Sequence, residues 1–182
     1  PLNLSEPNSY FLNMRLAALK SDAKLCQAVL KAPLVEANPI QDEPLKNGCG
    51  WKNAVRMSYA GGTRLSADKL TCEMTAALTM WLEHEVQPAA SKYFSKKVIS
   101  VQHMGTYACR NIAGSKFWKD FRSQHATASA IDIDSFTLSD GRSISVLRNW
   151  KGDTPEARFL HDIHERACRY FRVAIGPDFN AA

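Results

Sequence analysis

Hydrophobic residues near the start of the chain recur about one helical turn apart and predict a helix over residues 10–20. The positions that share this spacing are Tyr10, Leu12, Met14, Leu16 and Leu19. A second short helix is expected over residues 21–31, with Ser21 as its N-cap. An irregular stretch then leads to the glycine-rich turn at residues 48–50. The prolines that indicate it are Pro33, Pro39 and Pro44.

The longest helical pattern begins after Ser66 and continues to Pro88, which we expect to stop or bend the helix. Its apolar positions are Leu70, Met74, Ala77, Leu78, Trp81 and Leu82. Another helix is expected to begin at Thr154, because threonine is a good N-cap and Pro155 suits the first helical position. Its apolar face comprises Phe159, Leu160, Ile163, Ala167 and Phe171.

Short apolar segments between the two long helices predict strands. They are residues 98–101, 130–136 and 144–146. The pair Asp140-Gly141 between the last two is a hairpin turn signal. Helices first, hairpin strands in the middle and a closing helix predict an α+β fold, with a small antiparallel sheet flanked by helices.

The length of 182 residues predicts one compact unit. Within it, we expect residues 1–50 to form a helical and irregular segment packed on a domain of residues 51–182. No run approaches the roughly 20 apolar residues of a membrane helix, so no transmembrane segment is expected. The chain opens at Pro1 with no signal peptide, so an exported protein would be seen here in mature form.

The formal net charge of +5 and the pI near 9.0 favour anionic surroundings such as nucleic acid, a membrane surface or an acidic wall polymer. The basic residues are scattered, however, and no stripe interleaves them with aromatic residues as a nucleic-acid groove needs. We therefore expect no nucleic-acid partner.

Five cysteines are spread along the chain without a Cys-x-x-Cys pair. They are Cys26, Cys49, Cys72, Cys109 and Cys168. Wide spacing suits disulfides in an oxidising compartment better than a metal cluster, and the odd count leaves one thiol over. Five buried thiols of a cytosolic protein are the alternative.

The segment of residues 123–134 carries the clearest chemistry. His125 lies in a small, polar, turn-prone stretch, and Asp132 lies in the strand that follows. The period of two places Asp132 and Asp134 on one face of the strand and the neighbouring isoleucines on the other. Zinc accepts imidazole and carboxylate together, and a catalytic site needs about three protein ligands, of which this segment supplies two. A solvated strand face beside a surface histidine is the alternative.

The run Ser123-x-His125-x-x-Ala128-x-Ala130-x-Asp132 resembles the Ser-x-His-x-x-Gly-x-Ala-x-Asp signature of a group of zinc peptidases. The group includes lysostaphin-type enzymes, D-Ala-D-Ala carboxypeptidases and dipeptidases, and murein endopeptidases. Ala128 departs from the pattern, because glycine is usual at that position.

A resemblance to the bacterial extensin-like C-terminal domain covers most of the chain. The segments that carry it are Trp81 with residues 86–90, Thr106 to Arg110, Ser123 to Phe136, Asp140 to Arg142, Phe159-Leu160, Ala167-Cys168 and Gly176 to Asn180. Such domains are similar to the zinc peptidases and belong to the bacterial envelope. The resemblance implies a fold like that of the D-Ala-D-Ala metallopeptidases.

By this resemblance His125 and Asp132 are zinc ligands, and Arg110 binds substrate or stabilises an oxyanion, with a structural ion pair as the alternative for Arg110. Ser123 either touches substrate or holds the metal-binding loop. His103 and Tyr107 are expected at the cleft rim, where they would bind substrate. Family members continue after the segment matched by Gly176 to Asn180 with a His-rich segment, which implies that the third ligand and the general base lie beyond residue 182.

The same resemblance places Cys109 and Cys168 near the site and suggests that they pair. Cys49 would then pair with Cys72 and leave Cys26 free. His161 and His164 lie three apart on the closing helix, and we expect them to flank its core face and not to form a second metal site.

The function implied is a zinc-dependent peptidoglycan hydrolase that cleaves an amide bond in murein peptides, as a carboxypeptidase or an endopeptidase. It would act in the periplasm or cell envelope. The alternative is a non-catalytic wall-binding or envelope module on the same scaffold.

Overall fold

Two short helices open the chain in the computed structural model, which describes residues 2–7, 10–113 and 116–180. They are α1 (Leu12–Ser21) and α2 (Ala23–Val29), close to the predicted ranges. The N-cap of α2 is Asp22, whose side chain accepts a hydrogen bond from the backbone N–H of Leu25 at 2.9 Å. The prediction of Ser21 as N-cap was therefore wrong, because the first helix extends through that residue.

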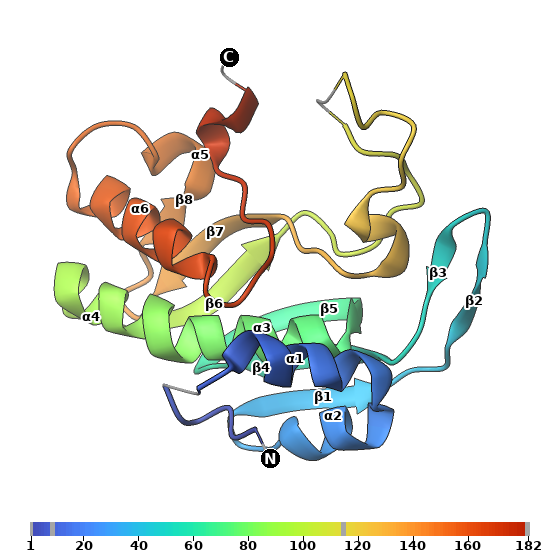
Figure 1. Cartoon of the computed structure of the whole chain (residues 1–182). Coiled ribbons are helices and arrows are strands. Elements are labelled where there is room, and N and C mark those ends of the chain that lie inside the picture. Colours follow the sequence, from blue (N-terminus) through green and yellow to red (C-terminus); the bar gives the residue numbers. More distant parts are fainter. Residues whose placement is uncertain (1, 8–9, 114–115, 181–182) are drawn as a thin grey trace.

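A six-stranded sheet with the order β1-β4-β5-β6-β7-β8 forms the centre of the fold (Figure 1). Its strands are β1 (Val35–Pro39), β4 (Ala54–Ala60), β5 (Thr63–Thr71), β6 (Val98–His103), β7 (Ile133–Leu138) and β8 (Ser143–Ser145). All neighbours are antiparallel except β5 and β6, which are parallel. The α+β class is confirmed, and the antiparallel sheet is corrected to a mixed one. A helical crossover between β5 and β6 returns the chain in the same direction.

The hairpin of β4 and β5 is the main element that the hydrophobic pattern did not reveal. It turns at Gly61 and Gly62, which have φ of +56° and +81° and so suit the left-handed region open to glycine. Leu70 fits both a helical and an alternating pattern, and its helical spacing to Met74 and Ala77 predicts a place in the helix. In the structure it belongs to β5, and the helix begins only after Thr71.

The long helix continues past Pro88, where we expected it to stop or bend. It comprises α3 (Cys72–Trp81), the π-helical turn η1 (Leu82–Val86) and α4 (Gln87–Phe94). Pro88 lies in the first turn of α4, immediately after the π turn. A proline lacks the N–H that an α-helix would use there, and the changed hydrogen-bond register of a π turn accommodates that loss.

The stretch predicted to be irregular contains three strands. β1 lies at the edge of the main sheet, where proline is tolerated because one side of the strand needs no partner. β2 (Glu43–Lys46) and β3 (Cys49–Trp51) form a separate two-stranded hairpin that projects from the body (Figure 1). The expectation of irregular structure from the prolines was therefore wrong for this stretch.

The C-terminal third follows the sequence pattern closely. β7 and β8 form the hairpin predicted at Asp140-Gly141, and the short helix α5 (Val146–Asn149) follows. α6 (Pro155–Ala167) begins as predicted, with the Thr154 side chain accepting from the N–H of Ala157 at 3.1 Å. The last element among the described residues is the 3-10 turn η3 (Pro177–Asn180).

The helices pack on the sheet through one contiguous apolar core. Aromatic contacts connect α6 to the sheet: Phe159 lies edge-on to Phe136 of β7, with ring centroids 5.6 Å apart. The indole N–H of Trp81 donates to the carbonyl of Ile163 at 2.8 Å, which ties α3 to α6. Among the described residues no helix is long and apolar enough to cross a membrane.

A buried carboxylate joins the π turn to the end of α6. Glu85 is 7% exposed and lies 3.4 Å from Arg166 and 3.5 Å from Arg169. It also accepts a hydrogen bond from the Tyr170 hydroxyl at 3.0 Å, and burial together with this carboxylate raises the pKa of Tyr170. The two guanidinium groups compensate the charge that would otherwise be costly to bury.

Two disulfides are present, and their pairing differs from the expected one. Cys26 pairs with Cys72, and Cys49 pairs with Cys109, while Cys168 is unpaired and exposed. Cys72 begins α3, which packs against α2 and so meets Cys26. Both bridges join the first 50 residues to the rest of the chain.

Removal of the first bridge tests this pairing. The double variant Cys26→Ala/Cys72→Ala should lower the free energy of unfolding by about 2–4 kcal/mol, because the bridge closes a loop of 46 residues in the unfolded chain. Urea denaturation measures the loss. Cys168→Ser, at an exposed position, should change stability by no more than about 0.5 kcal/mol. Recovery of a peptide linking Cys49 to Cys72 under non-reducing conditions would contradict the pairing.

Candidate functional site

The segment that carries the predicted motif begins with a short capped turn. Ser123 is the N-cap of the 3-10 helix η2 (Gln124–Thr127), and its Oγ accepts from the backbone N–H of His125 at 3.3 Å. The Ser123 carbonyl accepts from Ala126 N–H at 2.9 Å. Ser123 is 8% exposed, so its side chain acts here on the loop that holds His125.

Ala128 ends this turn in the left-handed conformation, with φ of +54°. Its N–H donates to the carbonyl of His125 at 3.2 Å, and its own carbonyl accepts from Thr71 N–H at 2.9 Å. Glycine adopts this conformation freely, whereas a residue with Cβ does so at a cost of about 1 kcal/mol. The backbone at Ala128 is therefore one that glycine would adopt more easily than alanine.

Asp132 lies immediately before β7 and pairs with the chain that follows β6. Its carbonyl accepts from Met104 N–H at 2.7 Å, and its N–H donates to the Gly105 carbonyl at 3.1 Å. The predicted alternation is confirmed: Asp132 and Asp134 are exposed, while the neighbouring isoleucines, Ile131 and Ile133, pack against the core.

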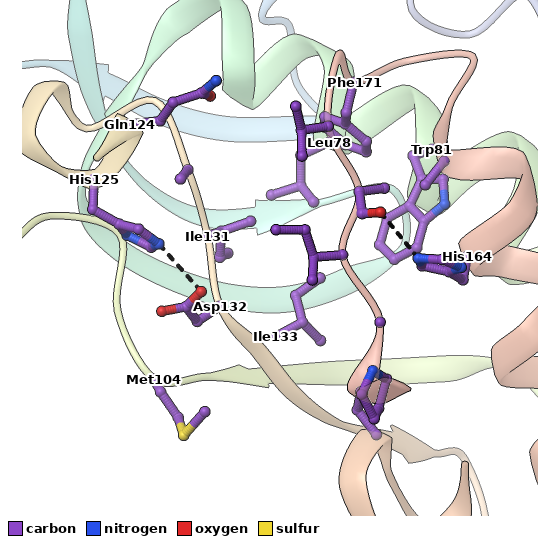
Figure 2. Close-up of a pocket in the computed structure, with 18 of the residues that line it drawn as sticks. Leu78, Trp81, Met104, Gln124, His125, Ile131, Asp132, Ile133, His164 and Phe171 are labelled. Atoms are coloured by element: carbon purple, nitrogen blue, oxygen red, sulfur yellow. Dashed lines mark hydrogen bonds and ion pairs between the residues drawn. The ribbon is translucent and has the colours of Figure 1, made fainter. Parts of the chain in front are cut away.

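His125 and Asp132 converge, as Figure 2 shows, with His125 Nε2 3.2 Å from Asp132 Oδ1. The His125 side chain is 10% exposed and the Asp132 side chain 47% exposed, so the pair is open to solvent mainly on the carboxylate side. A histidine and an aspartate at this distance form a hydrogen bond or an ion pair, and they also match two ligands of one metal ion.

The separation of the pair fits zinc coordination. Ligand bonds to zinc measure about 2.0–2.2 Å, so two ligand atoms at the tetrahedral angle lie about 3.3 Å apart. Imidazole nitrogen and carboxylate oxygen are both common zinc ligands. Within the residues that the structure describes, however, no group of three His, Cys, Asp or Glu side chains could hold a metal. The described chain thus supplies two donors of the three that a catalytic site needs.

The pair borders a cavity of about 760 Å³ with a mostly apolar lining. In Figure 2, His125 and Asp132 lie on one side of this cavity, and Trp81 and His164 lie on the other. The apolar residues that line it include Leu78, Trp81, Ile131, Ile133, Phe136, Leu160 and Phe171. A concave, mostly apolar lining with a few polar groups at its edge is typical of a ligand-binding site.

The two histidines of α6 bind backbone carbonyls. His164 Nε2 lies 3.1 Å from the carbonyl of Ala174, and His161 Nε2 lies 3.0 Å from that of Trp150. The His161 ring also stacks on the Trp150 ring, with centroids 3.9 Å apart. His164 lines the cavity and connects α6 to the C-terminal segment.

Arg110 is close to the site along the backbone but not in the lining of the cavity. Its carbonyl accepts from Ser123 N–H at 3.0 Å. The side chain is exposed, and it makes no hydrogen bond or ion pair within the described ranges. The structural ion pair considered for Arg110 is therefore not formed with any described residue.

The side chains of His103 and Tyr107 contact residues outside the cavity. His103 Nε2 lies 2.5 Å from the carbonyl of Ser66, and its Nδ1 accepts from Gly105 N–H at 3.1 Å. Tyr107 packs edge-on against Trp51, with ring centroids 5.1 Å apart. Neither lines the cavity beside His125 and Asp132. The structure therefore does not bring these two residues together with the proposed ligands.

Several residues of the cavity wall gave no signal in the sequence. Met104, Ile112 and Trp118 join His125 and Asp132 in the lining of this cavity only because of the fold. A second cavity of about 770 Å³ shares Gln124, Ala130 and Ile131 with the first. Among its lining residues is Glu73, whose pKa is raised by burial, against the opposing effect of Lys20 and Arg172.

Comparison with known proteins agrees with the expected resemblance to the extensin-like C-terminal domain and does not bear on the likeness to zinc peptidases. A family model described as extensin-like protein C-terminus matches residues 24–182. No curated protein and no solved structure is significantly similar to the chain. The match starts within α2 and so includes β1 and the β2–β3 hairpin.

Glycine substitution at two neighbouring alanines tests the backbone argument. Ala126 and Ala128 are both fully buried, but only Ala128 has a positive φ. Ala126→Gly should lower the free energy of unfolding by about 1 kcal/mol more than Ala128→Gly, because glycine relieves the left-handed strain at Ala128 alone. Thermal and urea unfolding of both variants measure the difference. Equal losses would contradict the explanation.

Proposed function

The chain belongs to the extensin-like protein C-terminus family, and on that premise we propose that it is a zinc-dependent hydrolase that cleaves an amide bond in peptidoglycan peptides. The observation that carries the proposal is the convergence of His125 Nε2 and Asp132 Oδ1 to 3.2 Å beside a large cavity. The likeness of the run from Ser123 to Asp132 to the zinc-peptidase signature supports the same reading.

The described residues take distinct parts in this proposal. His125 presents its imidazole from the turn that Ser123 caps, and Asp132 presents its carboxylate from the entry to β7. Zinc bound there would polarise an amide carbonyl and lower the pKa of a bound water to about 7. A third ligand has to come from outside the described residues, since these supply only two donors at the site. The His-rich segment that the family resemblance implies would supply that ligand and the general base.

Arg110 has the chemistry to bind the negative charge of the substrate. Its guanidinium is exposed and not engaged by a described partner, and the planar fork suits a carboxylate or the oxyanion of a tetrahedral intermediate. The backbone bond from Ser123 N–H to the Arg110 carbonyl keeps the arginine beside the motif. A swing of the long side chain would be needed to reach the pair, because Arg110 does not line the cavity.

The substrate and location follow from the family resemblance and from the bulk properties. A net charge of +5 favours an anionic polymer such as the bacterial wall. Two disulfides favour an oxidising compartment, since such bonds rarely persist in the cytosol. We propose the periplasm or cell envelope as the place of action.

A non-catalytic wall-binding module on the same scaffold is the second candidate. The observation that favours it is the absence of a three-ligand group among the described residues. In such a module the His125–Asp132 contact would be only a structural ion pair. Metal binding by the complete protein separates the two candidates.

Zinc titration of the full-length protein by calorimetry tests the ligand assignment. His125→Ala and Asp132→Ala should each weaken binding by roughly 100-fold or more, because loss of a ligand costs at least as much as loss of its outer-shell support. His84→Gln and Asp68→Asn are the matched controls and should leave affinity unchanged, since neither residue lines the cavity beside the pair. No zinc binding by the folded parent would favour the wall-binding module.

Digestion of purified peptidoglycan tests the reaction. Zinc-loaded full-length protein should release peptide fragments, detected by chromatography and mass spectrometry, and His125→Ala should abolish release. Arg110→Ala should lower kcat/KM by about 100-fold if the guanidinium stabilises the oxyanion. A folded, zinc-loaded protein that releases no fragments would refute the proposed hydrolysis, whether or not the protein binds zinc.

A further inference from the structure

The loop of residues 116–122 exposes an unusual amount of aromatic surface. Phe117 is 89% exposed, Phe121 57% and Trp118 56%. These three rings occupy five consecutive positions, so they form one local patch and not a scatter of single apolar residues. Contiguous exposed apolar surface of this kind marks an interaction site.

A framework of hydrogen bonds holds the loop in place. Ile112 N–H donates to the Phe121 carbonyl at 2.9 Å, and Asn111 and Arg122 form an isolated β-bridge. Arg122 Nε also donates to the Asn47 carbonyl of the β2–β3 hairpin at 2.8 Å. The rings of Trp118 and Phe121 lie edge-on, with centroids 5.2 Å apart. The aromatic patch is therefore presented on a closed loop tied to the hairpin.

The loop projects from the body of the molecule, as the yellow segment of Figure 1 shows. Its rings interleave with charge: Lys116, Lys119 and Arg122 are basic, and only Asp120 is acidic. This is a local exception to the scattered distribution of basic residues along the chain. The excess of positive charge complements an anionic surface.

We propose that residues 116–122 dock the protein on an anionic phospholipid bilayer. Phenylalanine rings have no hydrogen-bonding group, so they gain most from an apolar interior such as the acyl-chain boundary. A tryptophan ring suits the headgroup level of the interface. Lysines beside the rings bind lipid phosphates, and each contributes attraction near an anionic membrane surface. The combination of buried apolar area and cationic residues is what an interfacial anchor needs.

The chemistry of the patch favours a lipid over a sugar chain. A ring that stacks on a sugar uses one face. Phe117 is exposed on nearly all sides, and two of the three rings carry no polar atom. Insertion into a bilayer removes the whole ring surface from water, so it gains more free energy than stacking on a sugar, which covers one face.

Docking at this loop would set the position of the candidate site relative to the membrane. Ile112 and Trp118 line the cavity that His125 and Asp132 border. The cavity would then open close to the bilayer surface. This inference is independent of the proposed hydrolysis, because the loop residues are not proposed ligands.

Vesicle binding by the full-length protein tests the inference. The protein should co-sediment with vesicles of phosphatidylglycerol and phosphatidylcholine, and Phe117→Ser/Trp118→Ser/Phe121→Ser should reduce the partition coefficient by about a hundredfold. Lys116→Gln/Lys119→Gln should reduce it by roughly thirtyfold, and binding should weaken in high salt. The tryptophan emission should shift to the blue on binding, and Trp118→Phe should remove most of that shift while largely keeping affinity.

Two controls make the test specific. Met14→Ser/Leu147→Ser removes exposed apolar side chains elsewhere and should leave vesicle binding unchanged. His125→Ala should also bind vesicles as the parent does, so loss of the metal site and loss of docking are distinguishable. Absence of vesicle binding by the folded parent would overturn the inference. Loop-dependent pelleting with insoluble peptidoglycan, without binding to vesicles, would overturn it in favour of a glycan.

Discussion

The left-handed turn at Ala128 is the constraint on which the candidate site depends. Seven residues in an extended conformation span about 23 Å, whereas His125 Nε2 and Asp132 Oδ1 lie 3.2 Å apart. The chain returns on itself because the 3-10 turn curls residues 124–127 and Ala128 then reverses the direction. Its carbonyl is held by Thr71 N–H, and Asp132 N–H is held by the Gly105 carbonyl. The turn, the reversal at Ala128 and these two backbone hydrogen bonds thus determine the approach of the two side chains.

Those anchors place the site at the ends of the parallel strands. Thr71 ends β5 and caps α3, and Gly105 follows the end of β6. Beyond the backbone pairing of β5 with β6, two side chains continue the contact between these segments. His103 binds the Ser66 carbonyl, and Thr106 Oγ1 donates to the Lys69 carbonyl at 2.5 Å. His103 therefore helps to hold β5 and β6 together beneath the site. Because its ring faces Ser66, it does not line the cavity.

The disulfide between Cys49 and Cys109 gives the surface around the site its shape. It connects the β2–β3 hairpin to the segment that carries Arg110, and Arg122 bonds the same hairpin from the other side of the loop. The exposed loop and the hairpin are consequently joined at their bases. The β2–β3 hairpin and the loop of residues 116–122 both project from the core. The disulfide and the Arg122 hydrogen bond fix their positions.

Local interactions explain what the sequence alone determined. The Thr154 cap of α6, the Asp140-Gly141 turn and the alternation around Asp132 each depend on residues within about four positions, so their signals are present in a short stretch of chain. The segments that resemble the extensin-like C-terminal domain are likewise present in the sequence itself, and the family match confirms that resemblance.

Long-range contacts decided the rest. The parallel pairing of β5 with β6, the partner of each cysteine and the start of the long helix at Cys72 depend on residues tens of positions apart. Leu70 fits a helix and a strand equally, and only pairing with Val55 decides between them. Proximity of His125 to Asp132 was likewise predicted by a motif, but the cavity beside them arises from α3, α6 and β7, which no local pattern brings together. Periodicity and capping act within one element, whereas pairing and burial depend on which elements meet.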